Sequence, residues 1–213
     1  IATEEWLSSA LAAMELSQMI AQACWKKDSY LMQLPHFDHV LAAKCEKAGI
    51  ETIFDLINME DDDRNALLNF TDEMMVDVAH ALNRYPNIEL HHQIEDADDI
   101  RTEDQVVISI QFDVDEDMEP DTPIYAPYFP GKRVEQWWLV VGDAQSNVIR
   151  AIKRVDAYKT RKTNLVFTAP KAPGKYEYKL YFMCDSYRGC DQEYDFEFQV
   201  EEGGDDDDEE MEE

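Results

Sequence analysis

An alternation of two sets of side chains between residues 176 and 200, one apolar or aromatic and the other mostly polar, constrains the fold of this chain most strongly. The alternation is interrupted once, by a polar connection over residues 185–193, and it therefore predicts the two strands of a hairpin. The face expected to be buried consists of Tyr176, Tyr178, Leu180, Phe182, Cys184, Tyr194, Phe196, Phe198 and Val200. The intervening side chains are expected to face solvent. The connection contains a single glycine, is too long for a tight turn, and is expected to be free to serve function.

The same period of two recurs upstream of the hairpin. The whole pattern predicts strands over residues 88–95, 105–112, 134–142, 148–155, 163–168, 176–185 and 194–200. Polar turns, or turns that contain Pro or Gly, separate these short strands. Seven such strands are typical of an immunoglobulin-like β-sandwich, here of about 115 residues.

Helical periodicity dominates before residue 86. Residues 8–25 form a predicted helix that is apolar most of the way round, which is typical of a helix buried in a larger helical assembly. This pattern, and a first residue that is not Met, predict a fragment with further helices before Ile1. Shorter helices are predicted over residues 38–48, 51–58, 61–69 and 71–84, with Gly49 ending the first and Thr71 capping the last. The change of period at Tyr85-Pro86-Asn87 indicates a domain boundary.

The charge of the chain is strongly negative. There are 47 Asp and Glu against 19 Lys and Arg, a formal charge of −28. Residues 201–213 hold ten of the acids and no base, so 37 acids and 19 bases remain before them, a charge of −18. This field argues against nucleic-acid or membrane-surface binding by the chain as a whole. No apolar run is long enough to span a bilayer, and no signal peptide is present.

The sequence offers little material for catalysis or metal binding. With seven glycines in total, it contains no Walker loop, nucleophile elbow or glycine-rich dinucleotide loop. Its four cysteines follow no disulfide-dense pattern, which suits a reducing compartment. Neither these cysteines nor the five histidines have the spacing of a structural zinc site or of a zinc protease. We predict no active site and no metal.

Two weaker motifs are more consistent with structure than with ligand binding. Asp113, Asp115 and Asp117 have the spacing of a calcium loop, but Met118 and Ile124 stand where Gly and Glu would be needed. An EF-hand is excluded, and a calcium site on a sandwich loop stays a minor alternative. The helix junction at residues 48–50 is similar to a phosphate-gripping helix-hairpin-helix, yet the acids around it favour packing.

Residues 150–162 reverse the general charge. The bases there are Arg150, Lys153, Arg154, Lys159, Arg161 and Lys162, against one acid, and Tyr158 lies among them. This stretch could contact phosphates, with Tyr158 as a stacking platform. The favoured interpretation is the solvent face of a strand and a loop docked on an acidic neighbour.

Residues 123–130 concentrate prolines and aromatics. Prolines stiffen a segment and cannot donate to a strand ladder, while aromatics supply contact area, so this loop is a candidate surface for binding a protein. Tyr125, Tyr128 and Phe129 are its candidate residues, and Tyr187 and Arg188 in the hairpin connection are suited to the same role. Packing of the loop against its own domain is the equal alternative.

Several segments resemble one family. They are YFMCDSYRGCDQEY at 181–194, NRYPNIEL at 83–90, KDSYL at 27–31, QLPHF at 33–37, the acidic segment at 60–68, and the pairs Trp137-Trp138 and Gly142-Asp143. Together they resemble the C-terminal Sec63 homology unit of the Ski-two-like RNA helicases of the spliceosomal U5 ribonucleoprotein. The resemblance extends from the first helix to Val200.

The resemblance implies an α+β multidomain fold. Residues 1–34 would end a helical bundle, 35–86 would form a helix-loop-helix domain, 87–201 a fibronectin type III-like sandwich, and 202–213 a disordered acidic tail. It implies a nuclear, non-catalytic protein-interaction module, with ATP and magnesium used only in the parent helicase that unwinds the U4/U6 duplex. Its expected partners are spliceosomal proteins and the rest of its own helicase cassette, with weak or no RNA binding and no membrane. The alternative is an RNA-binding accessory domain that uses residues 150–162.

Overall fold

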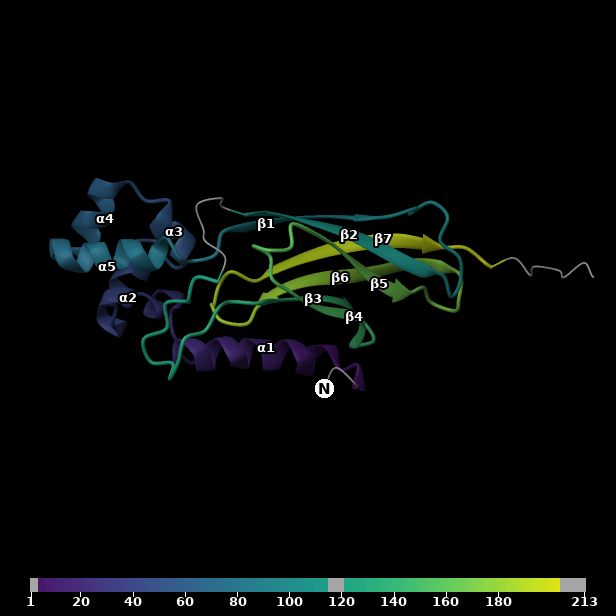
Figure 1. Cartoon of the computed structure of the whole chain (residues 1–213), viewed down its shortest axis with the longest axis horizontal. Helices are drawn as coiled ribbons and strands as arrows, with labels where there is room; N and C mark the ends of the chain where they lie inside the picture. The colour runs from purple at the N-terminus through teal and green to yellow at the C-terminus, as the bar shows by residue number, and fades with distance from the viewer. Residues whose placement is uncertain (1–3, 115–120, 204–213) are drawn as a thin grey trace, which may run out of the picture.

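The computed structural model describes residues 4–114 and 121–203. Four short helices gather at one end of an elongated molecule, two β-sheets fill the remainder, and the first helix runs along the sheets (Figure 1). The helices and antiparallel sheets together make an α+β chain. The predictions for the acidic loop beyond Val114 and for most of the acidic tail lie outside the described residues.

The helices follow from local capping chemistry. They are α1 (Leu7–Gln22), the 3-10 helix η2 (Tyr30–Gln33), α2 (His39–Lys47), α3 (Ile53–Ile57), α4 (Asp61–Leu68) and α5 (Asp72–Leu82). As predicted, the Thr71 hydroxyl accepts a hydrogen bond from the Met74 backbone and caps α5, and Gly49 adopts a left-handed φ of +82° just after α2. Thr52 and Asp55 form a capping box that starts α3.

All seven predicted strands are present. One sheet has the order β1-β2-β5, formed by β1 (Ile88–Ile94), β2 (Gln105–Val114) and β5 (Lys162–Thr168). The other has the order β4-β3-β6-β7, formed by β4 (Val148–Val155), β3 (Trp137–Asp143), β6 (Gly174–Cys184) and β7 (Gln192–Val200). The pairings within both sheets are antiparallel. Strand β3 starts at Trp137, later than predicted, and the Asp185 carboxylate accepts from the backbone N–H of the preceding Gln136 at 3.0 Å.

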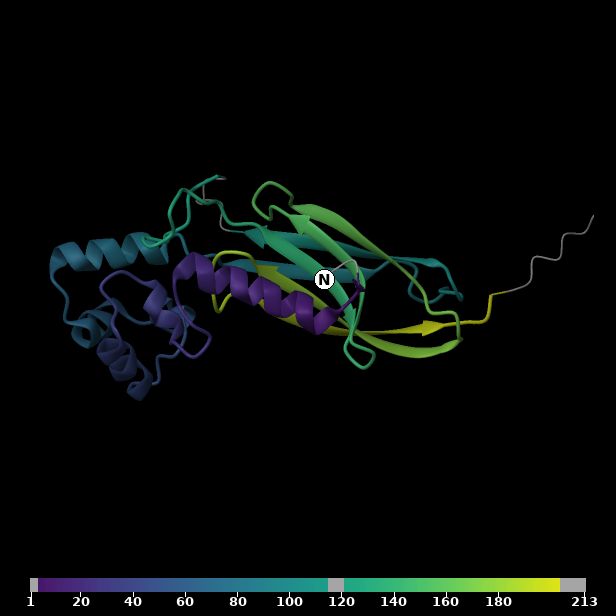
Figure 2. The same cartoon turned by 90° about the horizontal axis from the view of Figure 1, so that it is seen from below.

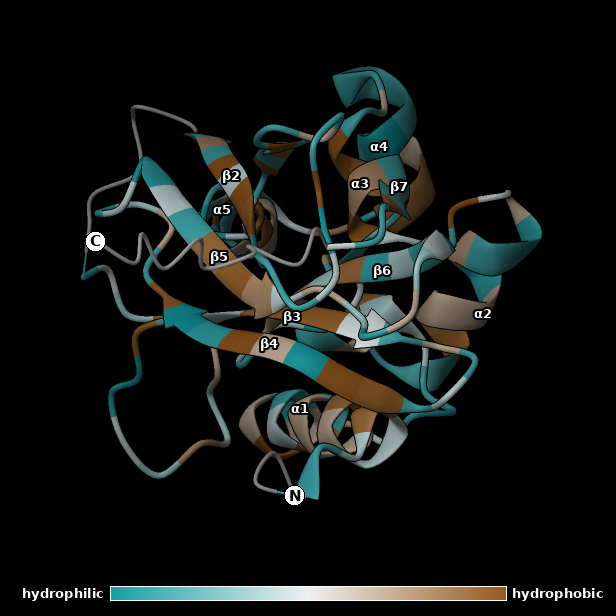
Figure 3. Cartoon of the chain, turned by 90° about the vertical axis from the view of Figure 1, so that its right-hand side faces the viewer, coloured by the Kyte–Doolittle hydropathy of each residue, from teal (hydrophilic) through white to brown (hydrophobic). Residues whose placement is uncertain are grey.

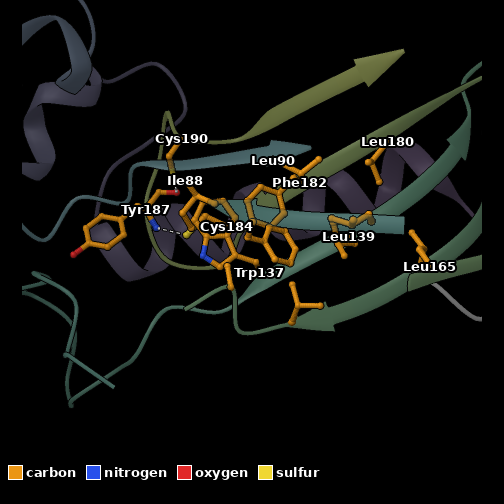
Figure 4. Close-up of a cluster of buried hydrophobic side chains, with 14 of the residues drawn as sticks. Ile88, Leu90, Trp137, Leu139, Leu165, Leu180, Phe182, Cys184, Tyr187 and Cys190 are labelled. Carbon is orange, nitrogen blue, oxygen red and sulfur yellow. Dashed lines mark hydrogen bonds between the residues drawn. The ribbon is translucent and has the colours of Figure 1, made fainter. Parts of the chain in front are cut away.

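The largest core lies between the two sheets. Trp137 stacks on Phe182 with ring centroids 4.2 Å apart, and Phe182 stacks on Phe112 of the other sheet at 5.2 Å. Figure 4 shows the rings of Trp137 and Phe182 among aliphatic side chains that include Leu90 of one sheet and Leu139 of the other. The predicted buried face of the hairpin is confirmed for most of its members, with Tyr176 and Tyr194 partly buried at its margins.

A second core corrects the prediction for the other face of β6. Tyr181 and Met183 were expected to face solvent, but both are buried beneath α1 with Val140 and Ile149. Helix α1 lies along the sheets in both side views (Figures 1 and 2) and below β3 and β4 in the end-on view (Figure 3). Among the described residues the partner of α1 is a sheet, and the expected helices before Ile1 stay a prediction.

Candidate protein-docking surface

The β6–β7 connection, expected to be free, is buried. Asp185, Ser186, Tyr187, Arg188 and Cys190 are each at most 5% exposed. The turn is organised by sulfur, because the Cys184 thiol accepts hydrogen bonds from the backbone N–H groups of Ser186 and Tyr187. Burial raises the pKa of the thiols of Cys184 and Cys190, which keeps both protonated. The connection is thus a framework on which other segments are built.

Helix α1 docks on this framework through polar side chains. Ser17 donates to the Asp185 carbonyl at 2.9 Å, Gln18 to the Cys184 carbonyl at 2.8 Å, and Gln22 to the Ser186 carbonyl at 2.9 Å. The first half of the same face is apolar and belongs to the second core. The carbonyls of Cys184, Asp185 and Ser186 lie where the strand ladder ends, and these side chains of α1 give them hydrogen-bond donors.

The outward face of α1 is apolar and has no cover among the described residues. We define the outer stripe as Ala12, Ala13, Leu16, Ile20, Ala23 and, just beyond the helix, Trp25. Leu16 is 48% exposed, Ile20 60% and Trp25 70%. A surface helix normally buries its apolar side chains and exposes its polar ones, whereas α1 buries Gln18 and Gln22 and exposes Leu16 and Ile20. Such a surface is typical of a face that binds another protein segment.

The helical end of the molecule is attached through Tyr187 and Arg188. The Arg188 carbonyl accepts from the Tyr85 hydroxyl at 2.8 Å and from the Gln33 amide at 2.9 Å. The Arg188 guanidinium donates to the carbonyls of Lys26 and Asp28 and lies 5.1 Å from the Tyr30 ring centroid. The Tyr187 hydroxyl accepts from the Tyr125 backbone N–H at 2.9 Å. In this conformation these two predicted contact residues serve internal packing.

The proline–aromatic loop is docked on α1 and leaves one aromatic exposed. Its Tyr125 carbonyl accepts from Gln22 at 3.3 Å, and Phe129 lies under the Arg133 guanidinium at 5.6 Å from the ring centroid. Tyr125 and Phe129 are half-buried, whereas Tyr128 is 81% exposed. Beside Tyr128 is a groove of about 160 Å³ whose lining includes Ala23, Pro35, Phe37 and Pro127. Because Ala23 belongs to both, the groove and the outer stripe are continuous, and together with Tyr128 they form the candidate docking surface.

The basic stretch is divided between structural and exposed residues. Arg150 pairs with Asp143 at 3.2 Å, Arg154 with Asp185 at 2.6 Å, and Lys159 with Asp121 at 2.5 Å.

The remaining side chains of that stretch complete the division. Lys153 donates to Thr163 and to the Asn164 carbonyl. Tyr158 is half-buried against Glu135, and burial together with that carboxylate raises its pKa. In the described part of the chain, Arg161 and Lys162 are the members of the stretch for which no ion pair or side-chain hydrogen bond is found.

The phosphate-gripping interpretation of residues 48–50 conflicts with their hydrogen bonds. The backbone N–H groups of Ala48, Gly49 and Ile50 donate to carbonyls of α2, namely those of Lys44, Cys45 and Glu46. A helix-hairpin-helix would instead direct such groups outward at phosphates. Packing is therefore the better interpretation.

Metal-binding groups and membrane-spanning helices are both absent from the described residues. Across residues 4–114 and 121–203, no group of three or more His, Cys, Asp or Glu residues is arranged to hold a metal ion. Within the same residues no helix is both long and apolar enough to cross a membrane.

Comparison with known proteins identifies the family. The model of the Sec63 Brl domain matches residues 1–197. The chain is 50% identical over 208 residues to the "U5 small nuclear ribonucleoprotein 200 kDa helicase" of Homo sapiens, covering 98% of this chain and 10% of that protein. The Drosophila melanogaster helicase of the same name is 48% identical, with 94% of this chain and 9% of the relative covered. The "Pre-mRNA-splicing factor brr2" of Schizosaccharomyces pombe is 37% identical over 94% of this chain and 9% of the relative. The chain thus spans about a tenth of the length of the curated relatives it matches.

Proposed function

This chain belongs to the Sec63 Brl domain family, and from that premise we propose that it is a non-catalytic protein-interaction module at the C-terminus of a spliceosomal ATP-dependent RNA helicase. Its partners would be the rest of its own helicase and further spliceosomal proteins in the nucleus. ATP and magnesium would be used elsewhere in the parent helicase, in the unwinding of U4/U6 RNA.

The observation that carries the proposal is the exposed apolar outer stripe of α1. Leu16 and Ile20 are exposed on the side of α1 away from the sheet, while Gln18 and Gln22 donate hydrogen bonds to the carbonyls of Cys184 and Ser186. Burying apolar area contributes about 25 cal/mol per Å², so a face of exposed Leu, Ile and Trp side chains gains when a second apolar surface covers it. We assign the remainder of the helicase as that second surface, because the chain accounts for about a tenth of its relatives.

The absence of catalysis is inferred from sequence chemistry. Phosphoryl transfer needs a phosphate cradle, a magnesium ligand and a positioned water, and we can assign none of these roles to the residues of this chain. The isolated chain is therefore expected not to hydrolyse ATP. Turnover that co-purifies with the chain through successive columns would contradict this inference.

We also propose the domain organisation that the resemblance implies. A helical-bundle segment would end at residue 34, a helix-loop-helix domain would cover 35–86, and a fibronectin type III-like sandwich would cover 87–201, followed by a disordered acidic tail. The sheet orders β1-β2-β5 and β4-β3-β6-β7, with Trp137 in the shared core, support the sandwich assignment.

The test of the α1 interface uses the human helicase expressed without the segment that aligns with this chain. The 213-residue chain is added in trans, and binding is measured together with thermal unfolding. Leu16→Glu and Ile20→Glu should each weaken binding about tenfold or more, at the scale of interface hot spots, with little change in melting. Val40→Glu is the matched control, because Val40 is 79% exposed on α2, away from the stripe. Unchanged binding by both stripe variants would refute the proposed interface.

A second measurement concerns the proline–aromatic loop. Tyr128→Ala should reduce binding to purified spliceosomal particles without lowering stability, because the ring is 81% exposed. Tyr125→Ala and Phe129→Ala should lower stability as well, since both rings are half-buried. If Tyr128→Ala binds normally, the loop serves only to pack against its own domain.

The RNA-binding alternative is tested at Arg161 and Lys162. Arg154 is unsuitable because it neutralises the buried Asp185. RNA binding by the chain should be weak, steeply dependent on salt, and unchanged by Arg161→Glu with Lys162→Glu, because the surrounding field repels polyanions. Tight binding at physiological salt that this double variant abolishes would favour the alternative.

A further inference from the structure

A polar pocket lies between α1 and the β6–β7 connection. Its volume is about 290 Å³, close to the lower end of the range of about 300–1,000 Å³ typical of ligand pockets. Arg188 and Asp191 line it from the connection, and Gln18 and Met19 line it from α1. The pocket shares no residue with the outer stripe or with the groove beside Tyr128, so its ligand is inferred independently of the proposed docking surface.

Arg188 brings to this pocket a positive charge that has no counter-charge. The residue is 5% exposed, and its guanidinium donates to the carbonyls of Lys26 and Asp28 and lies over the Tyr30 ring. The Cys24 thiol, whose pKa is raised by burial, is a further hydrogen-bond partner and is neutral. Across residues 4–114 and 121–203, no carboxylate forms an ion pair with Arg188. A buried charge with only neutral partners is costly, so an anion beside it would be stabilising.

Asp191 brings a negative charge that also lacks a counter-charge. Its partly buried carboxylate accepts from the Gln18 side-chain amide at 2.9 and 2.8 Å and from the Cys184 backbone N–H at 2.7 Å. These donors are neutral, and no Lys, Arg or His of the described ranges forms an ion pair with Asp191. Burial, and then the nearby acids Glu15 and Glu193, raise its pKa. The surroundings of this carboxylate therefore favour a cation.

The two opposite charges line one pocket, and no ion pair joins them. Each is fixed by its own neutral partners. The other charged side chains of the lining, Glu15 and Lys26, pair with each other at 2.7 Å. A simple cation or anion in the pocket would be attracted by one of the two charges and repelled by the other. A molecule that carries both a positive and a negative group would be attracted by both.

We propose that this pocket binds a free α-amino acid, whose ammonium group pairs with Asp191 and whose carboxylate pairs with Arg188. An ionised aspartate accepts hydrogen bonds, as an ammonium group requires, and guanidinium N–H groups suit a carboxylate. A guanidinium has five N–H donors. The contacts with the two carbonyls and the thiol leave at least one of them for a ligand. Met19 and the 40% exposed Tyr30 provide apolar lining for the side chain of the amino acid.

The experiment titrates the isotopically labelled 213-residue chain with three small molecules that differ in charge. Leucine carries both charges, leucinamide carries the ammonium group alone, and N-acetylleucine carries the carboxylate alone. Leucine should bind with a Kd on the order of 1 mM and should shift the resonances of the Gln18 side-chain amide, the Tyr30 ring and the Asp191 carboxyl carbon. The other two molecules should each bind at least about tenfold more weakly, because either complex leaves one charge of the pocket unpaired.

Two substitutions test which charge each residue supplies. Asp191→Asn should weaken the binding of leucine about tenfold or more and leave the binding of N-acetylleucine unchanged. Arg188→Gln should weaken leucine by a similar factor and leave leucinamide unchanged. A merely structural role would not change the preference between the three molecules. Asp98→Asn, exposed in the connection between β1 and β2, is the matched control and should bind leucine as wild type does.

The proposal is overturned if leucinamide or N-acetylleucine binds the wild-type chain as tightly as leucine, if Asp98→Asn weakens binding as much as Asp191→Asn, or if the shifts lie outside the pocket. It is also overturned if about 10 mM leucine, tenfold above the expected Kd, causes no shift, in which case the pocket holds water only. If a variant fails to fold, the ranking of the three molecules on the wild-type chain still decides.

Discussion

Gln18 of α1 donates to both carboxylate oxygens of Asp191, at 2.9 and 2.8 Å, across 173 residues of sequence. The same amide nitrogen donates to the Cys184 carbonyl, and the Cys184 backbone N–H donates to Asp191 at 2.7 Å. Burial raises the pKa of Asp191 to about 6, and the hydrogen bonds from Gln18 and Cys184 oppose that shift. The first helix is therefore joined to the residue before β7 through one partly buried carboxylate.

Gln18→Leu should destabilise the chain by about 1–3 kcal/mol. Leucine fills a similar volume but leaves the Asp191 carboxylate and the Cys184 carbonyl short of a donor in a buried setting. Urea unfolding measures the loss, and NMR should show the pKa of Asp191 moving further upward. Ser17→Ala, which removes two partly buried hydrogen bonds but leaves Asp191 untouched, is the milder control. A variant as stable as wild type, with the pKa of Asp191 unchanged, would show that the contact is incidental.

Arg133 and Arg154 should behave as a coupled pair. Both meet the buried carboxylate of Asp185, at 3.0 and 2.6 Å. Loss of one leaves the other to neutralise the charge, so Arg133→Gln or Arg154→Gln alone should cost about 1 kcal/mol. The double variant leaves a buried carboxylate without a cation and should cost about 3–5 kcal/mol. Strictly additive losses in urea unfolding would contradict a shared role.

The order and type of most elements could be predicted from sequence because local rules determine them. Alternation located β6 and β7, and the Thr71 cap and Gly49 placed two helix boundaries. The strand pattern and the helix boundaries each depend on residues close together in the sequence, so they can be predicted without knowing which distant segments pack against them.

The environment of α1 and of the β6–β7 connection could not be predicted in this way. Tyr181 and Met183 carried a signal, since apolar side chains on both faces of β6 indicate a strand covered on two sides, but not by which segment. Gln18 is one polar residue in a mostly apolar helix, and only the folded chain shows that it anchors that helix. Tyr187 and Arg188 look like surface contact residues by composition, and only the folded chain reveals that Tyr85 and Gln33 enclose them. Hydrogen bonds between residues far apart in the chain leave no periodic pattern in the sequence, so the sequence alone does not predict them.

Alanine substitutions at three glycines distinguish the cost of a left-handed backbone from the cost of steric crowding by the added methyl group. Gly49 and Gly189 adopt left-handed φ values of +82° and +88°, but a Cβ on Gly49 meets no atom within 4 Å, whereas one on Gly189 lies 3.1 Å from the Tyr30 ring. Gly49→Ala should therefore cost about 1 kcal/mol for conformation alone, and Gly189→Ala about 2–3 kcal/mol because the Tyr30 ring and the buried Tyr85, whose hydroxyl lies 3.3 Å away, must also shift. Gly131→Ala, with open space and no left-handed φ, is the control and should stay within about 0.5 kcal/mol of wild type. If both variants lose the same free energy of unfolding, the β6–β7 connection accommodates the added methyl group and the prediction is wrong.

The last prediction concerns Glu135, which is 6% exposed and accepts a hydrogen bond from the Trp137 indole at 3.1 Å. Burial raises its pKa from 4.5 to about 7, against the opposing hydrogen bonds from Trp137 and Tyr158. Between those two values the folded chain keeps a proton that the unfolded chain has released. The unfolded state binds fewer protons there, so the free energy of unfolding should fall as pH rises from about 5 to 7 and then level off.

Glu135→Gln isolates this contribution, because glutamine keeps the acceptor and stays neutral at every pH. The variant should lose most of the decline between pH 5 and 7 and should be more stable than wild type at pH 8 by on the order of 2 kcal/mol. Burial lowers the pKa of His92, and a lowered histidine pKa makes stability rise with pH, so its effect has the opposite sign. The His92 contribution is the same in wild type and in Glu135→Gln, so it cancels when one stability curve is subtracted from the other. Urea unfolding at intervals of half a pH unit provides the two curves, and parallel curves would rule out Glu135 as the titrating group.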